Sequence, residues 1–382
     1  MPETYNLAGY GGMVADRVRM DAYAAAIARV VRPESVVVDI GAGAGILSLL
    51  ACRAEARRVY AIEPADAIHA ARDAARENGM EERIELIQGI STEVELPERA
   101  DVVVSDLRGA LPLFQHHVAT IADARARFLA PGGVLIPRMD TLRAAPVQAA
   151  EAYGRIVAPW EEGVQGLRMT AARRMSVNTW GKARIPGDAL LAEPQAVAVL
   201  DYRTITEPDV SAELAWTVAR AGTAHGVSIW FDAELVDGIG YTTGPGAPET
   251  VYGTPLLPFV EPVPVEEGDR ITVDLQARLV GDDYTWIWNT RIERPGRPPA
   301  AFRQSTLLGA PVSPARLRRR AHGFRPVLGE GGRIDRMILA RMDGGASLAE
   351  IAREVQAAFP GHFARWEDAL TRVGRLSEAY AE

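Results

Sequence analysis

The chain has 382 residues, more than one hydrophobic core usually serves, so we expect two or three domains. Its net charge of −8 argues against general nucleic-acid binding, and no apolar run approaches the ~20 residues that a membrane helix needs. The single cysteine, Cys52, excludes a disulfide framework or a thiolate metal site, and we expect no bound metal. The first residues lack a basic segment followed by an apolar core, so we expect a cytoplasmic protein.

Strand and helix patterns alternate in the first third of the chain. Apolar residues recur at helical spacing from Met13 to Val31. Buried-strand patterns then occupy residues 36–39, 58–62, 83–88, 101–106 and 132–137, with helical patterns at 46–53, 65–78 and 116–129. This alternation predicts an α/β doubly wound parallel sheet.

The pattern changes near Thr141 to short alternating segments separated by turns, which predict an antiparallel β-barrel or sandwich. The proline-rich stretch "RPGRPPAAF" indicates a linker. Amphipathic helical patterns follow at 333–345, 347–359 and 365–380. We therefore divide the chain into N-terminal helices, a parallel-sheet domain, an antiparallel domain, a linker and a small helical domain, at residues 1–32, 33–138, 139–296, 297–324 and 325–382.

A glycine-rich turn follows the first strand pattern in "VVVDIGAGAGILSLLA". Glycines at such a turn let the backbone approach a ligand closely, although a tight turn without a ligand is the alternative. The spacing of Gly41, Gly43 and Gly45 differs from the G-x-G-x-x-G of nicotinamide dinucleotide sites. Glu63 ends the second strand pattern, where a carboxylate can accept both hydroxyls of a ribose. Together these residues predict a nucleoside-containing cofactor other than NAD.

These residues resemble motif I and the following strand of class I S-adenosylmethionine-dependent methyltransferases, and more narrowly the protein arginine methyltransferases. "GMVADRVRMDAYAAAI" resembles the helix that covers their cofactor, and "FLAPGGVLIPRMDTL" resembles their fifth strand and the hinge into their barrel. The resemblance extends in order over roughly residues 5–293. It implies S-adenosylmethionine as the cofactor. It also implies a homodimer formed by an arm at residues 166–187, which we expect to be neither strand nor regular helix.

The resemblance also implies a set of residues that bind the cofactor: Arg19, Asp39, Gly41, Gly43, Glu63, Thr92 and Glu93. Arg19 would pair with the methionine carboxylate, and Glu63 would hold the ribose. The adenine would lie beside residues 91–93, where the family's acid aligns with Thr92 and Glu93 follows one place later.

Two loops depart from the family pattern. Asp106 and Gln115 stand where the family has the two glutamates that grip a guanidinium, and we take them as the catalytic candidates. The threonine–histidine–tryptophan loop appears as Thr250, Val251 and Tyr252, without its histidine.

The methyl acceptor is accordingly a peptide, a protein or a small guanidino or amine compound. Arginine comes first because Asp106 remains. An imidazole, an amide or another small-metabolite nucleophile is the alternative, and a non-catalytic cofactor-binding scaffold is a further one. We expect His116 and His117 to form a polar first helical turn, although a role in proton transfer is open.

The tail from about residue 325 resembles the small leader-peptide-recognising domains of the pyrroloquinoline-quinone D type. A structural cap on the barrel is an equal alternative.

Overall fold

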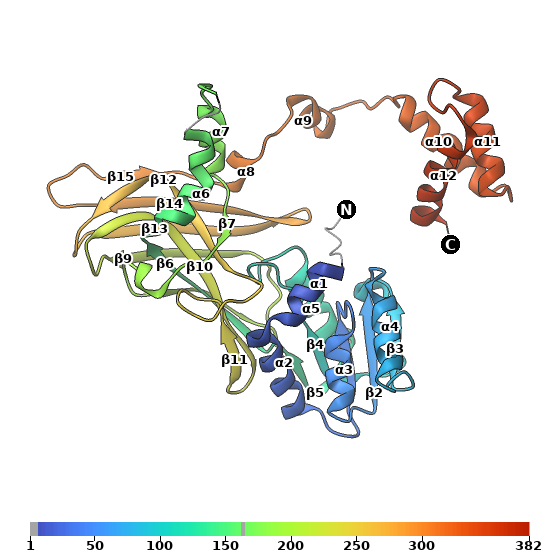
Figure 1. The fold of residues 1–382 in the computed structure, drawn as a ribbon, viewed down its shortest axis with the longest axis horizontal. Coiled ribbons are helices and arrows are strands. Elements are labelled where there is room, and N and C mark those ends of the chain that lie inside the picture. The colour runs from blue at the N-terminus through green and yellow to red at the C-terminus, as the bar shows by residue number, and fades with distance from the viewer. Residues whose placement is uncertain (1–6, 162–164, 382) are drawn as a thin grey trace. The chain divides into compact units, whose positions relative to one another are not determined.

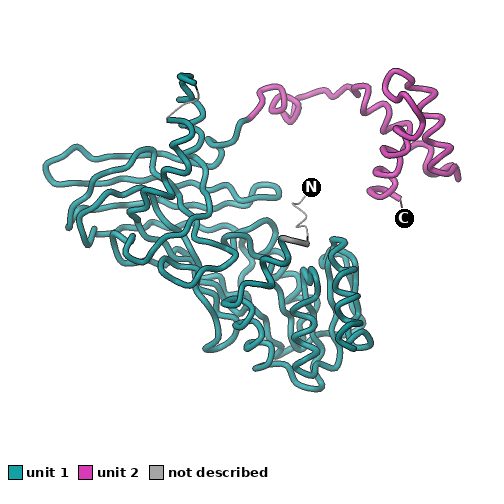
Figure 2. Tube along the Cα trace, viewed as in Figure 1, with its two compact units in different colours: residues 1–311 teal, residues 312–382 magenta. Residues whose placement is uncertain are grey.

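The computed structural model describes residues 7–161 and 165–381, and the chain divides into two compact units, residues 1–311 and 312–382 (Figure 2). Within the described ranges, no helix is long and apolar enough to cross a membrane. The cytoplasmic location stays a prediction.

The first unit begins with a parallel five-stranded sheet in the order β3-β2-β1-β4-β5 (Figure 1). Every residue of the central strand β1 is buried, as its continuous apolar sequence predicts. The strands are β1 (Val36–Ile40), β2 (Arg58–Glu63), β3 (Ile84–Gln88), β4 (Ala100–Ser105) and β5 (Leu129–Ile136). The predicted doubly wound sheet is thus confirmed, and the carboxyl ends of β1, β2 and β4 meet at one edge.

The helices of this region are α1 (Leu7–Ala15), α2 (Arg17–Val30), α3 (Ile46–Arg53), α4 (Ala67–Glu77) and α5 (His117–Arg127), with a short 3-10 turn, η1 (Ser91–Glu93). The single helical pattern predicted from Met13 to Val31 is divided at Asp16. The Asp16 carboxylate accepts a hydrogen bond from the Arg19 backbone N–H, so it caps α2 and ends the continuity with α1.

Two antiparallel sheets complete the first unit, as the alternating segments predict. One has the order β7-β12-β10-β6-β8 with β11 beside β10, and the other has the order β15-β14-β13-β9. Their strands are β6 (Met139–Val147), β7 (Gly181–Ala183), β8 (Gln195–Asp201), β9 (Val210–Thr217), β10 (Gly222–Val236), β11 (Ile239–Thr242), β12 (Thr254–Val265), β13 (Arg270–Val280), β14 (Asp283–Glu293) and β15 (Ala300–Phe302). Trp288, Phe231 and Phe259 are fully buried in the hydrophobic core that both sheets share.

Helix α2 connects the parallel sheet to the antiparallel sheets. It contacts α3 and β5 on one side and β10 and β11 on the other. Its buried Tyr23 and Ile27 belong to the same core cluster as residues of both regions. The amino-terminal helices, the edge of the parallel sheet and the antiparallel region therefore meet at one place.

The segment 166–187 is more regular than predicted. It contains α7 (Thr170–Ser176) and β7, and with α6 (Ala150–Glu161) it stands out from the antiparallel sheets (Figure 1). The expectation of neither strand nor helix was wrong because tertiary contacts fix the segment: Arg173 donates to the Val260 carbonyl and the Tyr153 hydroxyl, and β7 pairs with β12.

The end of the first unit lies beyond the predicted start of the linker. Within residues 297–324, β15 pairs with β14, and α8 (Thr306–Gly309) begins at a Ser305 side-chain cap. The side chain of Gln304 is buried and donates to the carbonyls of Val177 and Pro258. These residues belong to the antiparallel region, because they supply partners for its backbone groups.

The second unit contains α9 (Pro314–Arg320) and three longer helices, α10 (Glu330–Met342), α11 (Leu348–Ala358) and α12 (Trp366–Tyr380). The three predicted helices are confirmed. Their apolar faces form a separate core with Ile334, Ile338, Ile351, Val355 and Val373 at its centre. The likeness to leader-peptide-recognising domains stays a prediction.

A chain that ends at Pro311 is expected to keep the stability of the first unit, because the core of the second unit is its own. The free energy of unfolding should change by less than about 0.5 kcal/mol, as for surface changes, in urea unfolding followed by tryptophan fluorescence. A chain that ends at Gly296 is the control and should be clearly less stable, because it loses β15 and Gln304. Equal destabilisation by both truncations would contradict the prediction.

Candidate functional site

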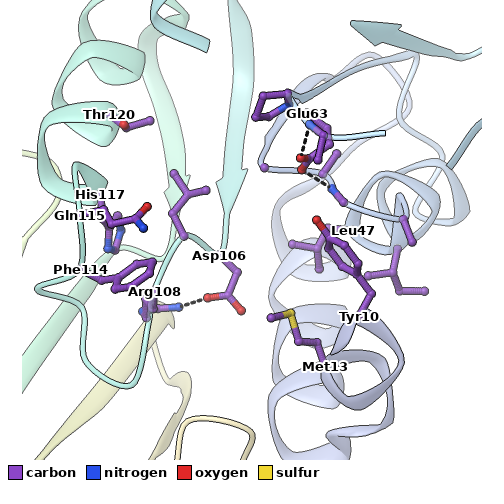
Figure 3. Close-up of a pocket in the computed structure, with 18 of the residues that line it drawn as sticks. Tyr10, Met13, Leu47, Glu63, Asp106, Arg108, Phe114, Gln115, His117 and Thr120 are labelled. Atoms are coloured by element: carbon purple, nitrogen blue, oxygen red, sulfur yellow. Dashed lines mark hydrogen bonds and ion pairs between the residues drawn. The ribbon is translucent and has the colours of Figure 1, made fainter. Parts of the chain in front are cut away.

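A cavity of about 330 Å³ lies at the carboxyl edge of the parallel sheet (Figure 3). Its walls come from α1, from the loops after β1, β2 and β4, and from the start of α5. The volume is within the range of small-molecule sites. The cavity brings together predicted residues that are as distant in the sequence as Arg19 and Gln115.

The glycine loop and Glu63 form one wall of the cavity. Gly41 and Gly43 have φ values of +72° and +53°, which residues other than glycine rarely adopt. A Cβ atom at Gly43 would also lie 2.5 Å from the ring of Tyr10. The N–H of Gly43 donates to Glu63 Oε2 at 2.9 Å, and the N–H of Ala65 donates to Oε1 at 2.9 Å. Two backbone donors therefore fix the carboxylate of Glu63 at the cavity (Figure 3).

Asp39 lies in β1, two residues before Gly41, and does not line the cavity. Its side chain is fully buried, and Oδ2 accepts a hydrogen bond from the Ser48 hydroxyl at 2.6 Å. Oδ1 has no hydrogen-bond partner among the residues that the structure describes. Burial raises the pKa of Asp39 to about 7, because a charged carboxylate is poorly solvated there.

Arg19 lines the cavity but is already engaged with protein groups. Its Nε donates to Asp106 Oδ2 at 2.5 Å, and Nη1 donates to the Met13 carbonyl at 2.6 Å. Burial lowers its pKa, but the charge of Asp106 more than compensates and holds the pKa above the usual value. Arg19, which we predicted to bind the carboxylate of the cofactor, is thus paired with the carboxylate of Asp106 in this structure.

Asp106 reaches the cavity, and three donors surround its carboxylate. Besides Arg19, Nη1 of Arg108 lies 3.1 Å from Oδ1, and the Tyr252 hydroxyl lies 2.8 Å from Oδ1 and 2.6 Å from Oδ2. Burial raises the pKa of Asp106, but the two guanidinium groups outweigh it and lower the pKa below its usual value. Asp106 is therefore a stably charged acid, and the chain's own groups neutralise it.

Arg108 is the centre of this network. Its side chain is 0% exposed and binds Asp140 through two hydrogen bonds, Nε to Oδ2 at 2.7 Å and Nη2 to Oδ1 at 2.9 Å. Nη1 also donates to the Tyr23 hydroxyl at 2.8 Å, and the Tyr202 hydroxyl donates to Asp140 at 2.6 Å. Sequence reasoning missed Arg108, although a cation two positions after a candidate catalytic acid was a visible signal.

The second catalytic candidate, Gln115, lines the same cavity with a φ of +43°. Beside it, His117 is buried, its Nδ1 lies 2.9 Å from the Pro112 carbonyl, and its ring stacks on Tyr202. Burial lowers the pKa of His117 to about 4, so the ring is neutral near pH 7. The His116 side chain is 54% exposed and lies 3.2 Å from Asp282. Both histidines line the cavity at the start of α5, His116 as the exposed N-cap residue and His117 as the buried first residue of the helix.

The remaining predicted residues lie elsewhere. Thr92 and Glu93 are exposed in η1 and do not line the cavity, so their contact with an adenine stays a prediction. In the loop without the family's histidine, the backbone N–H of Val251 donates to Asp16 Oδ2 at 2.8 Å. A backbone group therefore joins this loop to the start of α2.

Two protein-family profiles match consecutive parts of the first unit. Residues 24–148 match the profile of the ribosomal protein L11 methyltransferase family, and residues 139–285 match that of the arginine methyltransferase oligomerization subdomain. Two solved structures share the fold. One is the Trypanosoma brucei PRMT1 enzyme–prozyme heterotetrameric complex with AdoHcy, with a TM-score of 0.70 at 22% identity over 78% of this chain and 96% of that chain. The other is Arabidopsis thaliana protein arginine methyltransferase 10, with a TM-score of 0.69 at 25% identity over 78% and 97%. The fold is that of a class I methyltransferase followed by an oligomerization subdomain.

Curated relatives point the same way. The chain is 31% identical to the probable protein arginine N-methyltransferase 6 of Arabidopsis thaliana over 58% of this chain and 53% of that protein. It is 31% identical to the human protein arginine N-methyltransferase 2 over 63% and 58%. The chain thus spans a little more than half the length of these relatives. Over this part, the chain is similar to protein arginine methyltransferases in sequence and in fold.

The pKa of Asp39 predicts a pH dependence of stability. A carboxyl whose pKa is about 7 when folded and about 4 when unfolded binds more protons in the folded state between these values, so stability falls as pH rises through this window. Asp39→Asn removes the effect. The variant should gain stability over the wild type between pH 4.5 and 7.5, by at most roughly 4 kcal/mol in urea unfolding. Asp73→Asn, which changes an exposed acid, is the control. An equal difference between Asp39→Asn and wild type at both pH values would be evidence against a buried, protonated Asp39.

Proposed function

We propose that the protein is an S-adenosylmethionine-dependent N-methyltransferase that acts on a side-chain nitrogen of a peptide, a protein or a free amino acid. The observation that carries the proposal is the single cavity that joins the glycine loop, Glu63 and Arg19 to Asp106 in an arginine-methyltransferase fold. The curated relatives are named arginine N-methyltransferases, which makes the guanidinium of arginine the acceptor to test first.

The residues of the cavity fit this cofactor. The loop at Gly41 and Gly43 brings backbone close to the ligand space, and a side chain at either position would collide with a neighbour. The carboxylate of Glu63 is fixed by two N–H donors, and its remaining lone pairs can accept hydrogen bonds from ribose hydroxyls. Arg19 would hold the carboxylate of the methionine part, which requires it to turn at least partly away from Asp106.

When bound, S-adenosylmethionine supplies a methyl group on a positively charged sulfur that is already reactive. The work left to the chain is to hold the acceptor in line with the methyl group at near-attack distance. Tyr10 and Met13 of α1 lie across the cavity from Phe114 and Gln115, so α1 helps to separate the reacting groups from water (Figure 3).

Glu63→Ala is expected to weaken cofactor binding by about 1–3 kcal/mol, because the ribose hydroxyls lose a charged acceptor. Isothermal titration with S-adenosylmethionine measures the change, and NAD should not bind either protein. Glu77→Ala, at the exposed end of α4, is the matched control and should bind as the wild type does. Failure of the wild type to bind S-adenosylmethionine would remove the basis of the proposal. Tight binding without turnover on any acceptor would instead support a scaffold.

We further propose a homodimer that uses the arm at residues 166–187. The match to an oligomerization subdomain supports this, as do two exposed apolar side chains on the arm, Leu167 and Met169, which are 66% and 38% exposed. Large apolar groups exposed together on a projecting element are typical of an interaction surface.

Leu167→Asp combined with Met169→Asp should therefore give a monomer in size-exclusion chromatography with light scattering at micromolar concentration. Val280→Asp is the control, because Val280 is a 62% exposed apolar residue at the end of β13, outside the arm segment. A wild type that is itself monomeric under these conditions would refute the proposal.

A further inference from the structure

We propose that Arg108 determines acceptor specificity: the chain's own guanidinium occupies Asp106, so the acceptor enters as an uncharged nitrogen base of the imidazole type. This inference rests on the proposed methyltransferase function and narrows its substrate class.

The charges at the acceptor end of the cavity are already balanced. Arg19 and Arg108 face Asp106 and Asp140, two cations against two anions, all of them buried. When Arg19 turns to the carboxylate of the cofactor, Arg108 and the Tyr252 hydroxyl remain on Asp106. S-adenosylmethionine adds one net positive charge of its own. Arg108 then faces both carboxylates, and the positively charged sulfur of the cofactor is the second cation beside them. A guanidinium would therefore enter as a third cation beside two carboxylates.

Among the described residues that line this end of the cavity, no other group supplies negative charge. Gln115 carries an amide where the family has a glutamate, and His117 is neutral. Tyr23, Tyr241 and Tyr252 stay protonated because burial raises the pKa of each hydroxyl. Glu63 is the remaining acid of the cavity wall, and its two oxygens are bound to the glycine loop and to Ala65 (Figure 3). An unpaired buried cation costs several kcal/mol, whereas an uncharged ring does not incur this penalty.

The chemistry of the acceptor narrows the choice to imidazole. Imidazole is neutral near pH 7 and has a ring nitrogen with a free lone pair, whereas the lone pair of an amide nitrogen is delocalised. The ring nitrogen forms a bond to the methyl carbon as the carbon–sulfur bond breaks. The electron pair of that bond stays on sulfur, which leaves neutral S-adenosylhomocysteine. The ring takes the positive charge and releases the proton of its other nitrogen to water.

The first experiment uses the full-length wild type, S-adenosylmethionine with a labelled methyl group, and two peptide libraries. The libraries share mixed flanking residues and have either histidine or arginine at the centre. Acid hydrolysis and chromatography then identify the labelled amino acid. Label in methylhistidine supports the proposal. Label in methylarginine overturns it but leaves the methyltransferase function standing. Label in neither library also overturns it, and cofactor titration then shows whether the proposed function survives.

The second experiment frees the Asp106 carboxylate from Arg108 and adds a second carboxylate to the cavity. Arg108→Met with Asp140→Asn removes both members of a buried ion pair, which avoids an unpaired charge, and Gln115→Glu adds a second carboxylate. The triple variant should gain methylation of the arginine library by roughly tenfold or more, the effect of one charge-assisted hydrogen bond. Arg143→Met with Asp232→Asn is the matched control, because it removes a half-exposed pair between β6 and β10, and it should keep the wild-type acceptor profile.

Thermal unfolding and titration with S-adenosylmethionine show whether the triple variant is folded. A folded variant that binds the cofactor but gains no activity on arginine would overturn the role of Arg108. If the variant does not fold, Gln115→Glu alone gives the second readout. With Arg108 still on Asp106, it should raise arginine methylation less than twofold, and a larger gain would contradict the proposal.

Discussion

The buried ion pair between Arg108 and Asp140 is the interaction on which the arrangement of the site depends. Asp140 lies in β6, the first strand of the antiparallel region, and Arg108 lies in the loop after β4 of the parallel sheet. The same guanidinium reaches Asp106, which in turn holds Arg19 of α2. Removing one partner of a buried pair commonly costs 3–5 kcal/mol, because the other charge is left uncompensated. Helix α2, the loop after β4 and strand β6 are therefore held together by buried ion pairs whose separation would be strongly destabilising.

Tyrosine hydroxyls complete the network and explain why it tolerates burial. Tyr202 donates to Asp140, and Tyr252 donates to both oxygens of Asp106. The Tyr23 hydroxyl accepts from Arg108 and donates to the Ser105 carbonyl. Buried charges are stable only where their remaining donors and acceptors are satisfied. The aromatic rings meanwhile join the surrounding core, so the polar centre and its apolar shell come from the same side chains.

The sequence was sufficient where a feature depends on neighbouring residues. The five parallel strands follow from short, largely apolar segments that alternate with helical patterns. The glycine loop with Glu63 follows from residues 20 positions apart that form a single β–turn–helix–β unit. It was insufficient where partners are distant. Arg108 and Asp140 are 32 positions apart, and Tyr252 and Asp106 are 146 apart, with no periodicity that relates them. The break at Asp16 was missed because the apolar pattern continues across it, and the helix in the arm was missed because contacts with Val260 and Tyr153 stabilise it.

The two halves of the cavity differ in the same way: one is built from residues close in the sequence, and the other from distant residues. The half that fits a cofactor is a local structure of backbone N–H groups and one carboxylate, and it does not require the antiparallel region. The half that would receive the proposed acceptor is assembled from α2, the loop after β4, β6 and the loop before β12. The short side chain of Asp106 places its carboxylate 3.1 Å from Nη1 of Arg108. The Asp106 carboxylate, which Arg108 and Tyr252 bind, therefore stabilises the fold rather than a ligand. Under the proposed function, the cofactor half can therefore keep its chemistry while the acceptor half changes the group that it accepts.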